Sequence, residues 1–321
     1  MRVLVTGGAG FIGSHLIDAI LAAGHEAAAL DDLSSGSPDN LPSGVPLFQV
    51  DVRDAGAVLK AVTEYKPDAI AHQAAQMSVS RSVREPRFDA EVNVVGLINT
   101  LDAAVATGAR RFVFASSGGV MYGDVHTPAP EETPADPISP YGIAKMVGER
   151  YLNFYAREHG LTCTALRYAN VYGPRQNPHG EAGVVAIFCT KMLQGQAGTI
   201  NGDGRYVRDY VYVTDVADAN LRALTVEGPS SFSVFNVGTS IPTDVNQLCA
   251  ALEMACSEAL MRHGRNSAVP PAGHGPARAG DLRSSLVAYD SIQKQLGWSP
   301  RMPLDHGIAE TVEWFAKKLL K

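Results

Sequence analysis

A tyrosine and a lysine, Tyr141 and Lys145, are four residues apart in a stretch with a helical pattern. Four residues make about one helical turn, so the two side chains lie on the same face of the helix. Tyrosine, with a pKa of about 10, is a poor base at neutral pH, but a nearby ammonium favours the phenolate and lowers that pKa. The pair therefore predicts an acid–base site that moves a proton to and from a hydroxyl group.

A predicted strand upstream of this helix ends in two serines, Ser116 and Ser117, which two glycines follow. Ser117 lies 24 residues before Tyr141. A serine at a strand end can hold the substrate hydroxyl that Tyr141 deprotonates, although Ser and Gly also suit an ordinary turn. The residue types alone leave open which serine has this role.

Three glycines near the N-terminus, Gly7, Gly10 and Gly13, are evenly spaced between an apolar strand and a helix. The first permits a tight turn, the second lets the backbone approach a pyrophosphate, and the third lets the helix pack close to the strand. The N-terminus of the helix adds free N–H groups and the positive end of a dipole. The loop therefore predicts a dinucleotide site.

An acidic residue ends the next predicted strand, where Asp31 lies 24 positions after Gly7. A carboxylate at this point hydrogen-bonds the adenosine ribose and repels a 2′-phosphate, and residues 32–37 contain no arginine. The pattern thus favours NAD over NADP. Asp51 and Val52, at the end of the third predicted strand, are placed to meet the adenine.

These residues need a scaffold, and short apolar runs alternate with helical patterns along the first half of the chain. Strands are predicted at Val3–Val5, Ala27–Leu30, Leu47–Val50, Ala69–His72, Arg111–Ala115 and Thr164–Tyr168, and helices at Ser14–Ala23, Ala55–Tyr65, Phe88–Thr107 and Tyr141–His159. Near-continuous apolar strands separated by helices indicate a parallel sheet covered on both faces. The expected fold is α/β, a Rossmann-type doubly wound parallel sheet with a smaller C-terminal α/β substrate domain.

The pattern changes near residue 170, after which Gly, Pro and polar residues become frequent. We therefore expect a cofactor domain over residues 1–170 and a substrate domain over residues 171–321. Val211–Leu224 again has the pattern of a strand and a helix, which leaves open a return of residues 211–240 to the first domain. The Gly- and Pro-rich stretch Arg262–Gly280 is expected to be a long irregular loop.

The composition excludes several classes of partner. Lys and Arg total 27 against 33 Asp and Glu, a net charge of −6, which argues against non-specific binding to nucleic acid or to an anionic membrane. No run approaches the roughly 20 apolar residues of a membrane span, and no apolar leader precedes Val3. Four scattered cysteines suit reduced thiols in a cytoplasmic protein rather than a disulfide framework or a metal site.

Six motifs together carry a family resemblance. They are GGAGFIG at 7–13, HQAAQ at 72–76, SSGGVMYG at 116–123, YGIAK at 141–145, LRYANVYGPRQ at 166–176 and GDGRYVRDYVYVTDVADA at 202–219. The chain resembles the extended short-chain dehydrogenase/reductases, and within them the UDP-glucose 4-epimerase group, over nearly its whole length. The resemblance implies an isomerase that uses NAD to epimerise a UDP-hexose at C4.

The resemblance also implies the mechanism. Tyr141 takes the proton from the 4-hydroxyl while C4 delivers a hydride to the nicotinamide, and the 4-keto sugar then turns and takes the hydride back on its other face. Ser117, chosen over Ser116 by its spacing to Tyr141, would polarise the 4-oxygen, and Lys145 would also hold the nicotinamide ribose. The cofactor-binding residues are expected to be Gly7, Gly10, Phe11, Ile12, Gly13, Asp31, Asp32, Ser35, Gly36, Asp51, Val52, Gln73, Ala74, Ala75, Asn93, Ser116, Tyr141, Lys145 and Tyr168.

The resemblance places most of the substrate contacts in the second half of the chain. The expected set is Ser117, Tyr141, Asn170, Val184, Thr199, Asn201, Arg208, Arg278 and Asp281. Asn170 and the two arginines match diphosphate and ribose contacts, and the fork of an arginine suits phosphate. Two positions depart from the pattern: Asn201 replaces an aromatic ring common near the uracil, and Met77 replaces a lysine found in some members. A small residue near Ser285 would let the pocket admit N-acetylated sugars.

Other activities share this pattern to different degrees. UDP-uronic-acid 4-epimerases use the same triad and differ in the sugar pocket. Nucleotide-sugar 4,6-dehydratases need an extra acid beside the catalytic serine, where this chain has Gly118 and Gly119. A non-catalytic NAD(P) sensor tends to lose the Tyr–Lys pair. The family also predicts a homodimer formed through the helices at Phe88–Thr107 and Tyr141–His159.

Overall fold

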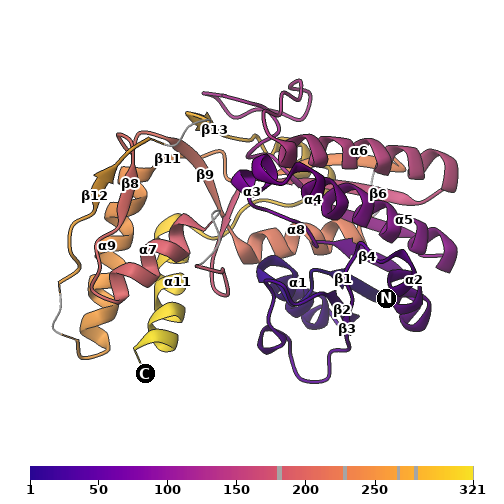
Figure 1. Cartoon of the computed structure of the whole chain (residues 1–321), viewed down its shortest axis with the longest axis horizontal. Helices are drawn as coiled ribbons and strands as arrows, with labels where there is room; N and C mark the ends of the chain where they lie inside the picture. Colours follow the sequence, from indigo (N-terminus) through magenta and orange to yellow (C-terminus); the bar gives the residue numbers. More distant parts are fainter. Residues whose placement is uncertain (179–182, 227–229, 266–267, 278–280, 321) are drawn as a thin grey trace.

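The computed structural model describes residues 1–178, 183–226, 230–265, 268–277 and 281–320. Seven of its strands form one sheet in the order β10-β6-β5-β4-β1-β2-β3, with every neighbouring pair parallel (Figure 1). They are β1 (Arg2–Thr6), β2 (Glu26–Asp31), β3 (Leu47–Gln49), β4 (Ala69–His72), β5 (Arg111–Ser117), β6 (Thr162–Tyr168) and β10 (Phe232–Val237). The strand order reverses between β1 and β4, which is where a doubly wound sheet binds ligands outside the carboxyl ends of its strands. The predicted fold class is confirmed.

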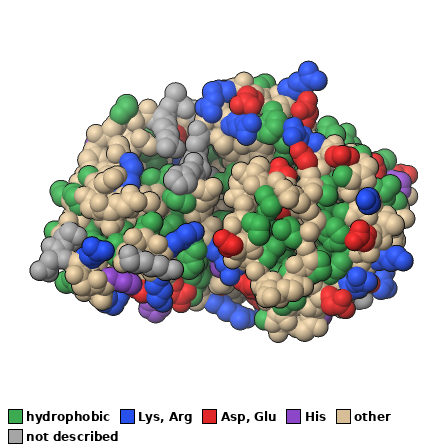
Figure 2. Space-filling model, turned by 60° about the horizontal axis from the view of Figure 1, so that its bottom comes forward, with side chains coloured by type: hydrophobic (Ala, Val, Ile, Leu, Met, Phe, Trp, Pro, Cys, Tyr) green, Lys and Arg blue, Asp and Glu red, His purple; other side chains and the backbone are tan. Residues whose placement is uncertain are grey.

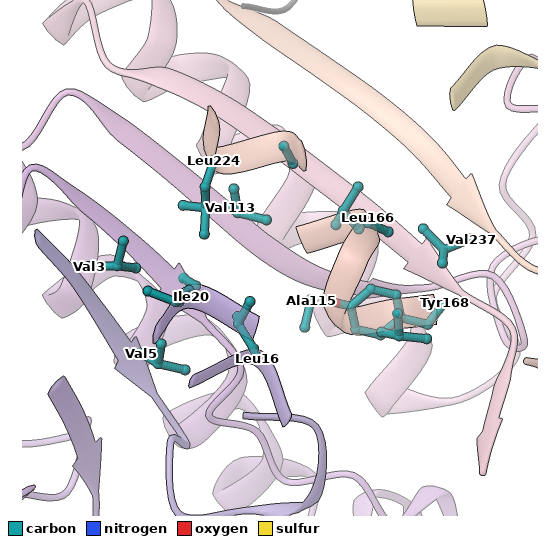
Figure 3. Packing of buried hydrophobic residues seen from close by; sticks show 14 of the residues in the cluster. Val3, Val5, Leu16, Ile20, Val113, Ala115, Leu166, Tyr168, Leu224 and Val237 are labelled. Carbon is teal, nitrogen blue, oxygen red and sulfur yellow. The ribbon is translucent and has the colours of Figure 1, made fainter. Parts of the chain in front are cut away.

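Alternate residues of the buried strands supply two separate cores. Val3 and Val5 of β1 pack with α1 (Phe11–Ala22) and α8 (Val213–Thr225) on one face of the sheet (Figure 3). Leu4, between them, packs with α2 (Ala55–Tyr65), α5 (Gly96–Thr107) and α6 (Pro140–His159) on the other face. This period of two explains why the strands are apolar throughout: both of their faces are buried.

The predicted helix at Phe88–Thr107 is interrupted in the structure. A short helix α4 (Pro86–Ala90) continues through a π-helical turn, η2 (Glu91–Val95), into α5, and a further short helix α3 (Val79–Arg84) precedes them. A π-helical turn contains one residue more than an α-helical turn and is often found at functional sites. The predicted helix at Phe88–Thr107 is therefore confirmed, with a π-helical turn inside it that the sequence pattern did not indicate.

Local signals fix the start of α6, which carries Tyr141 in its first turn. The Ser139 hydroxyl accepts a hydrogen bond from the Gly142 N–H at 3.2 Å, and Pro140 occupies the first helical position. Both are favoured at helix N-termini. Gly160, with a φ of 67°, ends the helix in the left-handed conformation.

A smaller layer, at the left of Figure 1, contains most of the second half of the chain. Its strands are β7 (Asn170–Tyr172), β9 (Val207–Tyr212), β11 (Pro242–Asp244) and β13 (Ser284–Ser285) in one sheet, and β8 (Thr199–Asn201) and β12 (Gly273–Gly275) in another. Helices α7 (Val184–Leu193), α9 (Val245–Arg262) and α11 (Leu304–Leu319) enclose its apolar core. Strand β12 lies inside the stretch expected to be an irregular loop, so that expectation is wrong in part.

The chain crosses between the two layers more than once. Helix α8 packs against α1, β10 pairs with β6, and α10 (Asp290–Leu296) packs against β10. The buried Trp298 and Leu224 belong to the same core cluster as Val3. Strand β10 thus extends the first sheet, and α8 packs on it. A short 3-10 turn, η1 (Pro38–Asn40), follows β2.

The surface and the thiols fit the composition. On the face drawn in Figure 2, acidic and basic side chains are interspersed among hydrophobic ones. All four cysteines are buried and free. Within the residues that the structure describes, no helix has the length and apolar character needed to cross a membrane, and no three His, Cys, Asp or Glu side chains gather as metal ligands.

Candidate functional site

The glycine loop between β1 and α1 forms a cradle that side chains would fill. Gly7 has a φ of 65°, and a Cβ there would lie 2.7 Å from the Ala74 backbone nitrogen. A Cβ at Gly13 would overlap the carbonyl oxygen of Gly7. Gly10 is the N-cap of α1, so the first N–H groups of the helix open toward this loop. The glycines therefore keep this loop close to the segment after β4, and Phe11 and Ile12 form the first turn of the helix that follows it.

Asp31 at the end of β2 is held in place by the same loop. Its carboxylate accepts hydrogen bonds from the Ala9 N–H at 3.0 Å and the Leu33 N–H at 2.9 Å. Burial raises the pKa of this carboxyl, because the backbone donors offset only part of the desolvation. Gly36 packs so closely that a Cβ there would lie 3.1 Å from Asp31 Oδ1.

The next predicted cofactor residues follow the ends of β2 and β3. Asp32 is exposed and accepts hydrogen bonds from Ser34, and Ser35 is also exposed. Asp51 forms an ion pair with Arg53, with Arg53 Nη2 2.5 Å from Asp51 Oδ2. These two residues, with Asp54, Glu91 and Val95, line an open groove at the end of the sheet, and Val52 is buried beside them. The groove lies where the sequence places the adenine.

A small polar cluster joins the ends of β4 and β6 to α8. The Tyr168 hydroxyl lies 2.9 Å from Asn220 Oδ1 and 3.2 Å from Gln73 Oε1, and the Gln73 amide donates to Asn220 Oδ1 at 2.9 Å. Gln73, Ala74 and Tyr168 are predicted cofactor residues, whereas Asn220 was missed. The half-buried Ala74 and Ala75 continue the same edge.

Ser117 and Tyr141 are brought together at the carboxyl end of β5. The Ser117 hydroxyl lies close enough to the Tyr141 hydroxyl to lower the pKa of Tyr141, against the larger effect of burial. The Lys145 ammonium is buried one turn further along α6, with Nζ 5.6 Å from the centre of the Tyr141 ring and 4.8 Å from that of Phe114. The three predicted catalytic residues therefore form one cluster.

Ser116 faces the opposite way, because neighbouring residues of a strand project to opposite sides. Its hydroxyl donates to Glu149 Oε1 at 2.6 Å. Glu149 also accepts from Arg167, at 2.9 Å from Nε and 2.7 Å from Nη2, in a buried ion pair. Glu149 lies one helical turn after Lys145, so the Ser116–Glu149 contact ties α6 to β5 at the level of the acid–base pair. This contact sets the side chain of Ser116 apart from that of Ser117.

The pKa values of the pair depart from the sequence-based expectation. Burial raises the pKa of Tyr141 to about 12, and burial lowers the pKa of Lys145 to about 8. Both shifts have the same cause, since a low-dielectric surrounding disfavours the charged form of either group. We expected Lys145 and the charge of a bound nicotinamide to lower the pKa of Tyr141; in the protein alone, burial has the largest effect on this pKa and raises it.

Asn93, a predicted cofactor residue in η2, belongs to a buried network. Its side chain accepts from the Gln76 N–H at 3.0 Å and donates to the Gln76 carbonyl at 2.9 Å and to Asp89 Oδ1 at 2.9 Å. Gln76 Nε2 also donates to Asp89 Oδ1 at 2.8 Å. Sequence reasoning missed Asp89, Gln76 and Glu149. The only available signal was spacing: Asp89 precedes Asn93 by four residues, and Glu149 follows Lys145 by four.

The predicted sugar pocket gathers around Gly119. A Cβ at Gly119 would lie 3.5 Å from Asn170 Oδ1 and 3.9 Å from Ser117 Oγ. Ser285, 4% exposed, donates from Oγ to the Gly119 carbonyl at 3.4 Å. Asn170 and Ser285 therefore both lie near Gly119, two residues after Ser117, although they come from β7 and β13.

The remaining predicted substrate residues lie in the smaller layer. Arg208 pairs with Asp281, with Nη2 2.5 Å from Oδ1, although 73 residues separate them in the chain. Val184 begins α7, and Thr199 and Asn201 are the two ends of β8. Met77 is 48% exposed. The prediction for Arg278 lies outside the described residues.

Comparisons with known proteins agree with this geometry. The fold and site define a dinucleotide-binding enzyme of the Rossmann class, and the model of the NAD dependent epimerase/dehydratase family matches residues 3–238. The chain belongs to this NAD-dependent family, which confirms the predicted family and cofactor.

Individual relatives match over nearly the full chain. The UDP-glucose 4-epimerase of Mycolicibacterium smegmatis is 46% identical over 325 residues, which cover 99% of each chain. The crystal structure of the Thermotoga maritima UDP-glucose 4-epimerase with UDP-glucose has a TM-score of 0.92 at 45% identity, covering 99% of this chain and 100% of that chain. The Thermus thermophilus UDP-glucose 4-epimerase in complex with NAD has a TM-score of 0.89 at 44% identity, covering 98% of this chain and 99% of that chain.

Proposed function

We propose that this protein is an isomerase that epimerises UDP-hexoses at C4 with NAD as its cofactor. The observation that carries the proposal is the Ser117 hydroxyl, which acts on the Tyr141 hydroxyl beside Lys145, in a chain similar to UDP-glucose 4-epimerases over nearly its full length. Two adjacent hydroxyl groups suit this chemistry, since one can take the proton of a sugar hydroxyl while the other holds its oxygen.

The residues present fit NAD. The glycine cradle leaves room for the pyrophosphate, Asp31 would hold the adenosine ribose, and Lys145 would hold the nicotinamide ribose. When bound, NAD supplies a positive charge beside Tyr141 and a carbon that accepts the C4 hydride and later returns it. That charge bears on Tyr141, because a cation beside the phenol offsets the burial that raises its pKa to about 12.

Inversion at C4 requires that the 4-keto sugar present its opposite face to the returning hydride, so the sugar must turn within the pocket. Small residues next to Ser117 support this step: Gly118, Gly119 and Ser285 carry little or no side chain. Ser117 can keep its hydrogen bond to the 4-oxygen during the turn, and Tyr141 returns the proton at the end. The small Ser285 also leaves space for an N-acetyl group, so we include UDP-N-acetylhexoses among the substrates.

The test is to incubate the purified protein with UDP-glucose and no added NAD, and to separate the products by ion-exchange chromatography. Formation of UDP-galactose is expected, and the same experiment with UDP-N-acetylglucosamine and UDP-glucuronic acid defines the substrate range. Tyr141→Phe should retain NAD and lose turnover, because the hydroxyl that moves the proton is gone. Turnover of UDP-glucuronic acid alone would replace the hexose proposal with a uronic-acid epimerase. Loss of water from the sugar would point to a dehydratase, although Gly118 and Gly119 supply no second acid.

We also propose a homodimer formed through α5 and α6. Ile143 and Phe154 are 46% and 51% exposed and are eleven residues apart, about three turns, so they lie on one side of α6. Val95, before α5, is 45% exposed. Phe154→Asp should therefore shift the sedimentation coefficient from dimer to monomer, while Met261→Asp, at an exposed position on α9, should not. A monomeric wild type would refute the proposal.

A further inference from the structure

The loop that follows β5 is fastened to a strand of the smaller layer. Residues 118–129 of this loop lie against residues 284–288, whose first two residues form β13. The Ser284 N–H donates to Asp124 Oδ1 at 2.7 Å, and the Val125 N–H donates to the Ser284 carbonyl at 3.1 Å. Two neighbouring loop residues therefore bind both polar backbone groups of Ser284. We call this pair of segments the clasp.

The contact continues along both segments of the clasp. The Ala129 N–H donates to the Leu286 carbonyl at 3.1 Å, and the Ala288 N–H donates to the Ala129 carbonyl at 2.9 Å. Val287 is 1% exposed and packs with Ala129 and the buried Met121 in a small apolar cluster. The clasp is therefore held by several backbone hydrogen bonds and has a core of its own.

The other edge of β13 faces the strand that carries the expected phosphate residue. β13 pairs with β9 (Figure 1), with Ser285 opposite Arg208. Arg208 is expected to bind the diphosphate of the substrate, whereas Ser117 is expected to hold the sugar 4-oxygen. The loop of the clasp begins directly after Ser117, so β13 lies between the two parts of the substrate site. The position of β13 therefore bears on the space that is left for the sugar.

The side chain of Ser285 does little to fix its own position. Its Oγ lies 3.4 Å from the Gly119 carbonyl oxygen, which is long for a hydroxyl donor. Close packing limits movement toward the loop, because a Cβ at Gly118 would lie 2.7 Å from Val287 Cγ1. Movement away from the loop is opposed by the backbone hydrogen bonds, of which the one to the Asp124 carboxylate is of the stronger, charge-assisted kind.

We propose that Asp124 is a positioning residue that sets the width of the sugar pocket, and with it the preference between UDP-hexoses and UDP-N-acetylhexoses. The proposal rests on the function proposed above. The Asp124 hydrogen bond holds Ser284, and thereby keeps Ser285 beside Gly119. Without it, Ser284 is held to the loop by one hydrogen bond instead of two. This wall of the pocket can then move outward, and the larger sugar fits more readily.

The test compares Asp124→Ala with Asp124→Asn, whose amide oxygen can still accept the Ser284 N–H. Asp124 is exposed, so alanine removes the acceptor without leaving a buried cavity. In Asp124→Ala, kcat/KM for UDP-N-acetylglucosamine relative to UDP-glucose should rise about tenfold, the lower end of what one methylene group in a pocket is worth. Asp124→Asn should keep the wild-type ratio. Glu132→Ala, which removes another exposed carboxylate between β5 and α6, is the matched control and should also keep it.

A purely structural role for Asp124 gives a different result. It would lower kcat/KM for both sugars equally, or lower the stability alone, and leave their ratio unchanged. Either result would overturn the proposal. The same ratio change in Asp124→Asn or in Glu132→Ala would also overturn it, because the effect would then not depend on the acceptor for Ser284.

A second measurement needs no turnover. The dissociation constants of the two UDP-sugars are measured by calorimetry in Tyr141→Phe, which should not convert them, with and without Asp124→Ala. Their ratio should shift about tenfold toward the acetylated sugar, and amide hydrogen exchange at Ser284 should become faster. An unchanged ratio, or unchanged exchange, would overturn the proposal. A shifted ratio in a protein whose wild type converts neither sugar would retain the role of Asp124 and reject the proposed activity, whereas binding of neither sugar would overturn both.

Discussion

The two strand-end serines provide the sharpest test of the site, because they are adjacent in sequence and face opposite sides of β5. Ser117 acts on the pKa of Tyr141, whereas Ser116 donates to the buried Glu149. Alanine at either position removes one hydroxyl. The two variants should therefore separate catalysis from stability.

For Ser117→Ala, we expect kcat to fall by about 10²–10³, as when one preorganised donor to the reacting oxygen is lost. Its unfolding free energy should change little, since the side chain is only half-buried. For Ser116→Ala, the lost hydrogen bond goes to a charged group and is worth about 1.5–3 kcal/mol of stability. Glu149 keeps its two bonds from Arg167, so kcat should stay within about threefold, less than 1 kcal/mol of barrier.

The assay compares initial rates of UDP-glucose conversion with urea unfolding of the same preparations. Bound NAD is quantified in each variant, so that loss of cofactor is not mistaken for loss of chemistry. The reasoning is refuted if Ser116→Ala loses activity at unchanged stability, or if Ser117→Ala remains fully active. Equal losses in both variants would also refute it, because they would mean that strand alternation does not divide the two roles.

Three further predictions concern the cradle, the buried ion pair and the lysine. Gly7→Ala should purify with little bound NAD, because the added Cβ would lie 2.7 Å from the Ala74 backbone nitrogen and the residue has a φ of 65°. A variant that purifies with stoichiometric NAD would contradict this. Arg167→Ala leaves Glu149 buried and unpaired, so the free energy of unfolding measured in urea should fall by about 3–5 kcal/mol. A fall of less than about 1 kcal/mol would contradict this. Lys145 has a pKa of about 8 in the folded protein, against 10.5 for an ordinary lysine. Between these two pH values the lysine is protonated in the unfolded chain but not in the folded one, so the free energy of unfolding should rise from about pH 8 to about pH 10. Lys145→Met should lack this gain, and parallel stability curves for the two proteins would rule it out.

The local sequence was enough to predict the cofactor half of the site. The three glycines lie in the turn after β1 and in the first turn of α1, and Asp31 ends β2, the strand that pairs with β1. Short-range geometry therefore brings these residues together. The same holds for Tyr141 and Lys145, since a helix places residues four apart on one face. Buried strands with continuous apolar runs likewise predicted a parallel sheet without knowledge of the packing.

Tertiary structure alone decided what depends on distant partners and on burial. Strand periodicity says that Ser116 and Ser117 face opposite sides, but only the packing of α6 on β5 shows which of them meets Tyr141. Ser116 and Glu149 meet although they are 33 residues apart in the chain, so their spacing carries no signal. The pKa of Tyr141 divides in the same way, because a neighbouring charge can be read from residue types, whereas desolvation depends on how completely the folded chain excludes water around the phenol.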